Sequence, residues 1–150
     1  MDRLTDLKQR YQSLPSLLRL VTLPLLILGA VVVITPLVPG MRFNLDGVEF
    51  QWRELWETRL ALALLVLGSL MFLAGIGTLL ARPWARPMLL ALPFIQVIPF
   101  YLAHWVFGAP APIRSISVTT YLFLCVVWAA IAAVYLYGRS AVRKHFAGTA

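Results

Sequence analysis

The chain has 150 residues, of which 61% are hydrophobic and only 13% are charged, with a formal net charge of +7 at pH 7. Soluble domains have about 25% charged residues, so this composition argues against a water-soluble domain and indicates a membrane protein. The basic residues are dispersed at the ends of apolar runs, which is typical of topology signals and not of a nucleic-acid-binding patch. We therefore expect the lipid bilayer, and no nucleic acid, among its partners.

Four apolar runs without Asp, Glu, Lys or Arg organise the chain, at 20–38, 60–80, 88–107 and 118–137. Each has the length of about 20 residues that a helix needs to cross a hydrocarbon core of about 30 Å. The sequence therefore predicts an all-α membrane protein, with one domain formed by a bundle of four transmembrane helices. The first run is too long for the apolar core of a signal peptide and lacks a small-residue cleavage site, so we expect it to remain as a signal anchor.

Residues 2–14 precede the first run and have the pattern of a short amphipathic helix. Apolar side chains recur at three- and four-residue steps, at Leu4, Leu7, Tyr11 and Leu14, and polar residues fill the positions between them. This spacing predicts a helix that lies on the membrane surface as an anchor, and a helix that docks a partner is the alternative.

The first outer loop, 41–59, has the alternation of a β-hairpin. Asp46-Gly47 is a strong two-residue turn signal, and strand side chains alternate between two faces. The turn places apolar pairs on one face and polar pairs on the other: Met41/Trp52, Phe43/Phe50 and Leu45/Val48 against Arg42/Gln51 and Asn44/Glu49. We expect a small outer hairpin, with 114–118 as a candidate third strand.

A short helical segment is expected to follow the hairpin at 53–59. Trp52, Trp56 and Leu60 are four residues apart, and tryptophan is typical of the membrane interface. We expect the apolar side chains of the outer loop to face a partner, the bundle or the bilayer surface; these are Phe43, Leu45, Phe50, Trp52 and Trp56.

Small residues predict the closest helix contacts, either within the bundle or between subunits. The second run offers Gly68, Ser69, Ala74, Gly75, Gly77 and Thr78, and the fourth offers Cys125, Ala129 and Ala133. Cys125 is the single cysteine, which excludes an intramolecular disulfide, and we interpret it as a packing residue.

Gln96 is the polar residue at the centre of the third run, between Pro93 and Pro99. The two prolines lack N–H groups, so the helix is expected to kink and to leave carbonyl groups unpaired beside the amide. Trp128 lies near the middle of the fourth run, and we expect its indole N–H to contact Gln96 directly or through water. The site is either an interhelical hydrogen bond or a polar cavity for a ligand such as a quinone head group or a lipid.

Two further patterns bear on this candidate site. Tyr121, Trp128 and Tyr135 are seven residues apart and therefore share one helix face, which is either a packing stripe or a ligand-lining wall. The dipeptides Leu23-Pro24 and Leu92-Pro93 occupy similar depths in the first and third runs, a faint sign of internal symmetry.

No catalytic or metal-binding constellation is present in the sequence. His104, toward the outer end of the third run, is the candidate that would join the loop acids in an outer-interface enzyme, but convergent ligands are lacking. We expect no catalysis, no metal and no cofactor.

The basic residues divide unequally between the two sides of the predicted bundle. One side carries Arg3, Lys8, Arg10, Arg19, Arg82, Arg86, Arg139, Arg143 and Lys144, and the other carries Arg42, Arg53, Arg59 and Arg114. Because positive residues accumulate on the cytoplasmic side, both termini, including the tail 138–150, are expected in the cytoplasm of a bacterial-type inner membrane.

Two functions of different classes follow as hypotheses. The first is a non-catalytic accessory subunit, assembly factor or interaction partner that associates with another membrane protein or forms a homo-oligomer. The alternative is a small transporter or binding protein for a lipid-like or apolar molecule, held in a cavity near Gln96 and Trp128. Proton coupling through a buried carboxylate is not expected, because none of the runs contains one.

Overall fold

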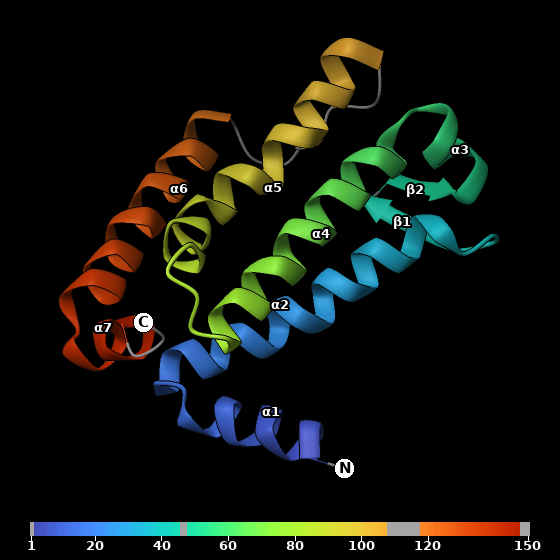
Figure 1. Ribbon diagram of the computed structural model, residues 1–150. Helices are drawn as coiled ribbons and strands as arrows, with labels where there is room; N and C mark the ends of the chain where they lie inside the picture. Colours follow the sequence, from blue (N-terminus) through green and yellow to red (C-terminus); the bar gives the residue numbers. More distant parts are fainter. Residues whose placement is uncertain (1, 46–47, 108–117, 148–150) are drawn as a thin grey trace.

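The structure, a computed structural model, describes residues 2–45, 48–107 and 118–147 (Figure 1). Its elements in chain order are α1 (Asp2–Ser13), α2 (Ser16–Ile34), η1 (Thr35–Leu37), β1 (Arg42–Leu45), β2 (Val48–Gln51), α3 (Trp52–Glu57), α4 (Leu60–Leu79), α5 (Ala85–Phe107), α6 (Val118–Ala133), η2 (Val134–Gly138) and α7 (Ser140–Ala147). The mostly helical fold with one small sheet confirms the prediction at that level.

Within the described residues, three helical segments are long and apolar enough to cross a membrane: Ser16–Leu37, Leu60–Leu79 and Thr119–Gly138. They coincide with the first, second and fourth predicted runs. The third run lies within α5, a helix of 23 residues that is not among these three. A fourth span and the orientation of the bundle therefore stay predictions.

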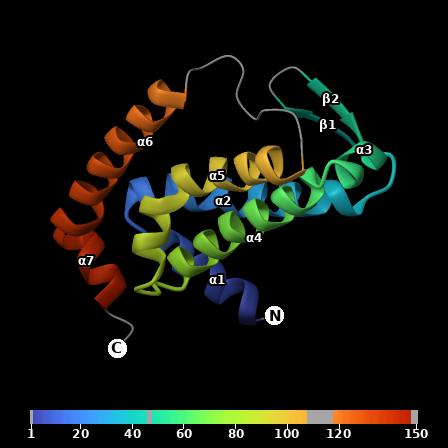
Figure 2. The ribbon, with the colours of Figure 1, turned by 90° about the horizontal axis from the view of Figure 1, so that it is seen from above.

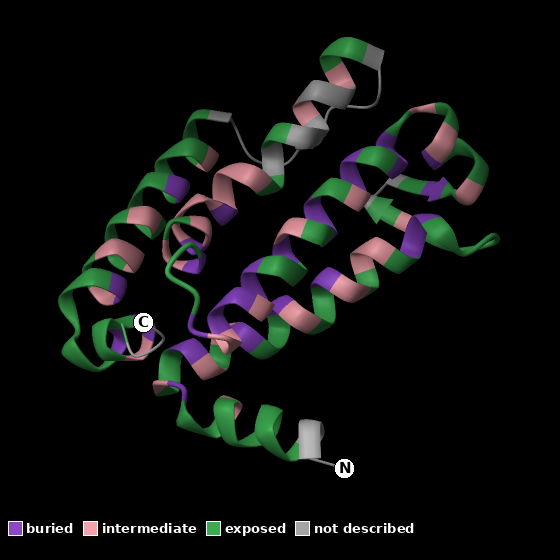
Figure 3. Cartoon of the chain, viewed as in Figure 1, coloured by how far each residue is buried: buried purple, intermediate pink, exposed green. Residues whose placement is uncertain are grey.

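α4 is the central helix of the bundle, and α2 and α5 pack against it. Within its apolar window 56% of the residues are buried, whereas the figure for the segment that includes α6 is 11%. Figure 3 shows the same contrast, since buried residues cluster along α4 while most of α6 is exposed. The core thus lies between α2, α4 and α5, and α6 stands at its side.

Glycines allow the backbones of α2 and α4 to come into direct contact. A Cβ atom on Gly29 would lie 2.6 Å from the backbone nitrogen of Phe72, and one on Gly68 would lie 2.8 Å from that of Val33. The structure places Gly68 and Gly75 of the predicted small-residue face against α2, whereas Ser69 is exposed. The face therefore packs within the bundle.

The hairpin forms with the predicted register, in which Arg42 pairs with Gln51, Phe43 with Phe50, Asn44 with Glu49 and Leu45 with Val48. Its turn at 46–47 lies outside the described residues. So does 114–117 of the candidate third strand, and Val118 begins α6. The described sheet has two strands.

Two tryptophans fasten the hairpin and α3 to the end of α2. The indole Nε1–H groups of Trp52 and Trp56 both donate to the carbonyl oxygen of Pro36, at 2.9 and 3.0 Å. Phe50 of β2 and Leu55 of α3 are buried. These contacts supply the supporting surface that an isolated two-stranded hairpin lacks in water.

The opposite end of the bundle carries α1 and α7 (Figure 1). The predicted tail 138–150 contains α7, which buries Val142 and Phe146. The ring nitrogen Nε2 of His145 lies 3.0 Å from the carbonyl oxygen of Thr78, and Arg86 Nη2 donates to the carbonyl oxygen of Arg143 at 3.0 Å. The segment is therefore a docked helix that covers the ends of α4 and α5.

Candidate functional site

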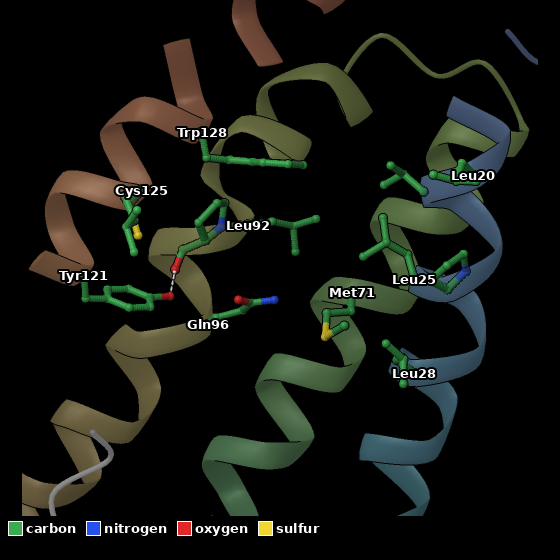
Figure 4. Close-up of a pocket in the computed structure, with 13 residues that line it drawn as sticks. Leu20, Leu25, Leu28, Met71, Leu92, Gln96, Tyr121, Cys125 and Trp128 are labelled. Atoms are coloured by element: carbon green, nitrogen blue, oxygen red, sulfur yellow. Dashed lines mark hydrogen bonds between the residues drawn. The ribbon is translucent and has the colours of Figure 1, made fainter. Parts of the chain in front are cut away.

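A cavity of about 570 Å³ opens between α2 and α6, and α5 and α4 complete its wall (Figure 4). Most of its lining is aliphatic or aromatic, with Gln96 as its side-chain amide. The lining comprises Leu20, Val21, Pro24, Leu25 and Leu28 of α2, Met71 of α4, Leu92, Pro93 and Gln96 of α5, and Tyr121, Leu124, Cys125 and Trp128 of α6.

The cavity exists because α6 packs against α5 and stands apart from α2 (Figure 2). Residues 121, 124, 125 and 128 recur at three- and four-residue steps, so they share the face of α6 that points toward α2. Residues 21, 24, 25 and 28 form the matching face of α2 by the same spacing. The two helices thus present opposite walls of one space.

One polar contact joins α5 and α6 at the cavity. The hydroxyl group of Tyr121 donates a hydrogen bond of 2.7 Å to the carbonyl oxygen of Pro93. Figure 4 shows Gln96 and Tyr121 projecting toward the same part of the cavity. The bond holds α6 beside the proline-containing part of α5.

The expected direct hydrogen bond between Gln96 and Trp128 is absent among the residues drawn in Figure 4, so the direct form of that hypothesis is wrong. Trp128 is seven residues beyond Tyr121, which is roughly 10 Å along a helix at 1.5 Å per residue. Trp128 therefore lies toward the other end of the cavity. The polar contact between α5 and α6 is the hydrogen bond from Tyr121 to the carbonyl oxygen of Pro93.

Among the residues that the structure describes, the lining of the cavity contains no Asp, Glu, Lys, Arg or His. Its titratable groups are the hydroxyl group of Tyr121 and the thiol of Cys125, which is buried and free. Within the described part of the chain, the side-chain amide of Gln96 forms no hydrogen bond with another residue. The cavity therefore combines an apolar surface with one side-chain amide that has no hydrogen-bond partner in the described part of the chain.

No family model, curated protein or solved structure matches this chain. Any assignment of function therefore depends on the chemistry of the cavity and its surroundings.

The cavity brings together three of the predicted site residues, Gln96, Tyr121 and Trp128. His104 is half-buried in α5 and does not line the cavity. In the described part of the chain, no three His, Cys, Asp or Glu side chains lie close enough together to hold a metal ion.

The predicted partner-facing residues of the outer loop take part in the packing of the hairpin. Phe50 is buried, Phe43 is half-buried, and Trp52 and Trp56 donate to Pro36. The side chain of Leu45 lies outside the described residues. These placements favour a role in fastening the hairpin, and contact with a partner stays a prediction.

Sequence reasoning missed the contribution of α2 to the cavity. The available signal was the repeated Leu-Pro dipeptide, because Pro24 and Pro93 both line the cavity, from α2 and α5. Each proline removes one backbone N–H from its helix and leaves the carbonyl oxygen four residues earlier without its usual partner.

Proposed function

We propose that this protein is a non-catalytic membrane protein that binds one apolar, lipid-like molecule in the cavity between α2 and α6. The observation that carries the proposal is the apolar lining around Gln96, in a cavity of about 570 Å³. Small-molecule sites in proteins have about 300–1,000 Å³ and combine apolar walls with few polar groups.

The position of the cavity suits a ligand that arrives from the bilayer. Both walls belong to candidate membrane spans, α2 and α6, and α6 makes its main contacts between helices with α5. A ligand that is dissolved in lipid therefore reaches the cavity sideways, without crossing a charged surface. The aliphatic side chains bind it through dispersion contacts, since lipid tails are as apolar as the walls.

A non-catalytic role fits the same lining. A buried thiol in apolar surroundings is inert, and neither Cys125 nor Tyr121 has a basic side chain beside it in the cavity. General acid–base or nucleophilic catalysis needs such a neighbour.

The experiment compares two tryptophan substitutions on α6. Leu124 lines the cavity and is 51% exposed, whereas Leu122 is 50% exposed and does not line it. Leu124→Trp is expected to fill the cavity and to weaken binding of a photoreactive long-chain alcohol at least about tenfold in lipid nanodiscs, while Leu122→Trp keeps wild-type binding. Equal binding by the two variants, or no saturable binding by the wild type, would overturn the proposal.

A role as an accessory subunit or interaction partner is the second candidate, and the exposure of α6 favours it. Only 11% of the apolar window that includes α6 is buried, so most of this helix is available to another membrane protein or a second copy. Purification in mild detergent followed by mass spectrometry tests this function. A monomer without a protein partner would contradict this second function. The same result would not bear on the proposal that the protein binds a ligand.

A further inference from the structure

We infer that the ligand is an uncharged single-chain amphiphile whose head group accepts a hydrogen bond from the side-chain amide of Gln96. This inference rests on the proposed function and adds the charge, polarity and size of the molecule. The three properties follow from separate features of the cavity.

The lining excludes a charged head group. None of the 13 lining residues is Asp, Glu, Lys, Arg or His, so a carboxylate, phosphate or ammonium group would have no counter-charge there. A charge that is moved into apolar surroundings without a partner costs far more free energy than a neutral polar group. Fatty acids and phosphate-bearing lipids are therefore poor ligands for this space.

Gln96 defines the position of the polar head. The hydroxyl hydrogen of Tyr121 is already donated to the carbonyl oxygen of Pro93, at 2.7 Å. The amide of Gln96 has no hydrogen-bond partner in the described chain, and Figure 4 shows it reaching into the cavity. An amide –NH₂ group has two hydrogens to donate. A carbonyl or hydroxyl oxygen of the ligand is the group that satisfies it.

The volume of the cavity suits one acyl chain. At roughly 30 Å³ per non-hydrogen atom, the share that a water molecule takes in the liquid, a cavity of about 570 Å³ holds roughly 20 such atoms. The α2 wall extends over 20–28, which is roughly 12 Å at 1.5 Å per residue. One chain of about a dozen carbons with a compact head fills this space, and a second acyl chain would lie outside it, in the bilayer.

Matched probes with twelve carbons test the inference: dodecan-2-one, dodecane, dodecanoate and dodecylamine. Radiolabelled dodecan-2-one is bound to the protein in nanodiscs, its partition into empty nanodiscs is subtracted, and the other three probes compete. We expect saturable binding of the ketone, with weaker competition by dodecane and the weakest competition by the two charged probes. In Gln96→Leu, ketone affinity is expected to fall roughly three- to tenfold, the effect of one hydrogen bond in a membrane protein.

Ile98→Leu is the matched control, because Ile98 is 53% exposed on the same helix and does not line the cavity. If dodecane or dodecanoate competes as well as unlabelled ketone, or Gln96→Leu binds the ketone like Ile98→Leu, the head-group inference is overturned while the cavity still binds. If no probe binds saturably, the proposed function itself fails. The two failures are therefore distinguishable.

Discussion

At Gly29 and Gly68, single hydrogen atoms occupy positions where any side chain would meet the backbone of the facing helix. The carbonyl oxygen of Gly68 lies 3.0 Å from the Cβ position of Gly29, and that of Gly29 lies 2.9 Å from the Cβ position of Gly68. Small residues that permit this approach are typical of membrane helix contacts. The packing of α2 on α4 thus depends on particular residues and not on general apolarity.

We predict that Gly68→Ala lowers the free energy of unfolding by about 1–3 kcal/mol, the usual cost of overpacking. The new methyl group would meet the backbone nitrogen of Val33 at 2.8 Å, and the backbone of α2 would have to move. Ala has a higher helix propensity than Gly, by about 1 kcal/mol, so a net loss of stability isolates the clash. Detergent-unfolding titration followed by circular dichroism measures it, with exposed Ser69→Ala as control. A stabilised Gly68→Ala would contradict the packing.

At the scale of elements, the two tryptophans that attach the hairpin and α3 to η1, directly after α2, share one hydrogen-bond acceptor. Because Trp52 and Trp56 both donate to the carbonyl oxygen of Pro36, either indole alone leaves that oxygen with a hydrogen bond. Only the loss of both removes every indole partner of this carbonyl group. An unsatisfied buried acceptor costs about 1–3 kcal/mol.

We therefore predict non-additive effects of Trp→Phe substitutions at these two positions. Each single variant should lose about 0.5–1.5 kcal/mol of stability, and Trp52→Phe/Trp56→Phe should lose more than the sum of the two. A double-mutant cycle from unfolding titrations measures the excess. Trp105→Phe is the control, because Trp105 is 77% exposed. Strict additivity would count against a shared acceptor.

The elements also show which parts of the fold local sequence patterns can predict. The Asp46-Gly47 turn signal and the alternation of 41–52 together were sufficient to predict the register of β1 and β2, because strand pairing across a short turn depends on neighbouring residues. α7 was not predicted, because this helix has only eight residues and its apolar face consists of Val142 and Phe146, a pattern too short to indicate a helix by itself.

For the whole molecule, the hairpin and α7 stand at opposite ends of the bundle (Figure 1). Combined with the distribution of basic residues, this arrangement predicts the hairpin outside and α7 in the cytoplasm. The same arrangement leads us to predict that α5 crosses the membrane, since the start of α5 lies beside α7 and the start of α6 lies toward the other end.

We predict that Glu49→Cys and Thr119→Cys react with an impermeant maleimide in intact cells, whereas Arg82→Cys and Lys144→Cys react only after permeabilisation. All four positions are exposed. Cys125→Ser provides the background, because Cys125 is the single native cysteine. Labelling of residues 82 and 119 from the same side would show that α5 does not span. Reversed labelling of all four positions would show that the protein has the opposite orientation in the membrane.

The sequence by itself determined the apolar runs that predict a membrane protein, the long helices that these runs form and the pairing of the hairpin strands. Run length, charge-free composition and residue alternation are properties of neighbouring residues, so they can be read along the chain. Helical spacing also placed Tyr121 and Trp128 on one face of the fourth run. Only the tertiary structure decided that this face and Gln96 meet Leu25 of α2 around one cavity. That meeting depends on α6 packing against α5 and standing apart from α2, a relation between segments about 100 residues apart that no local pattern encodes.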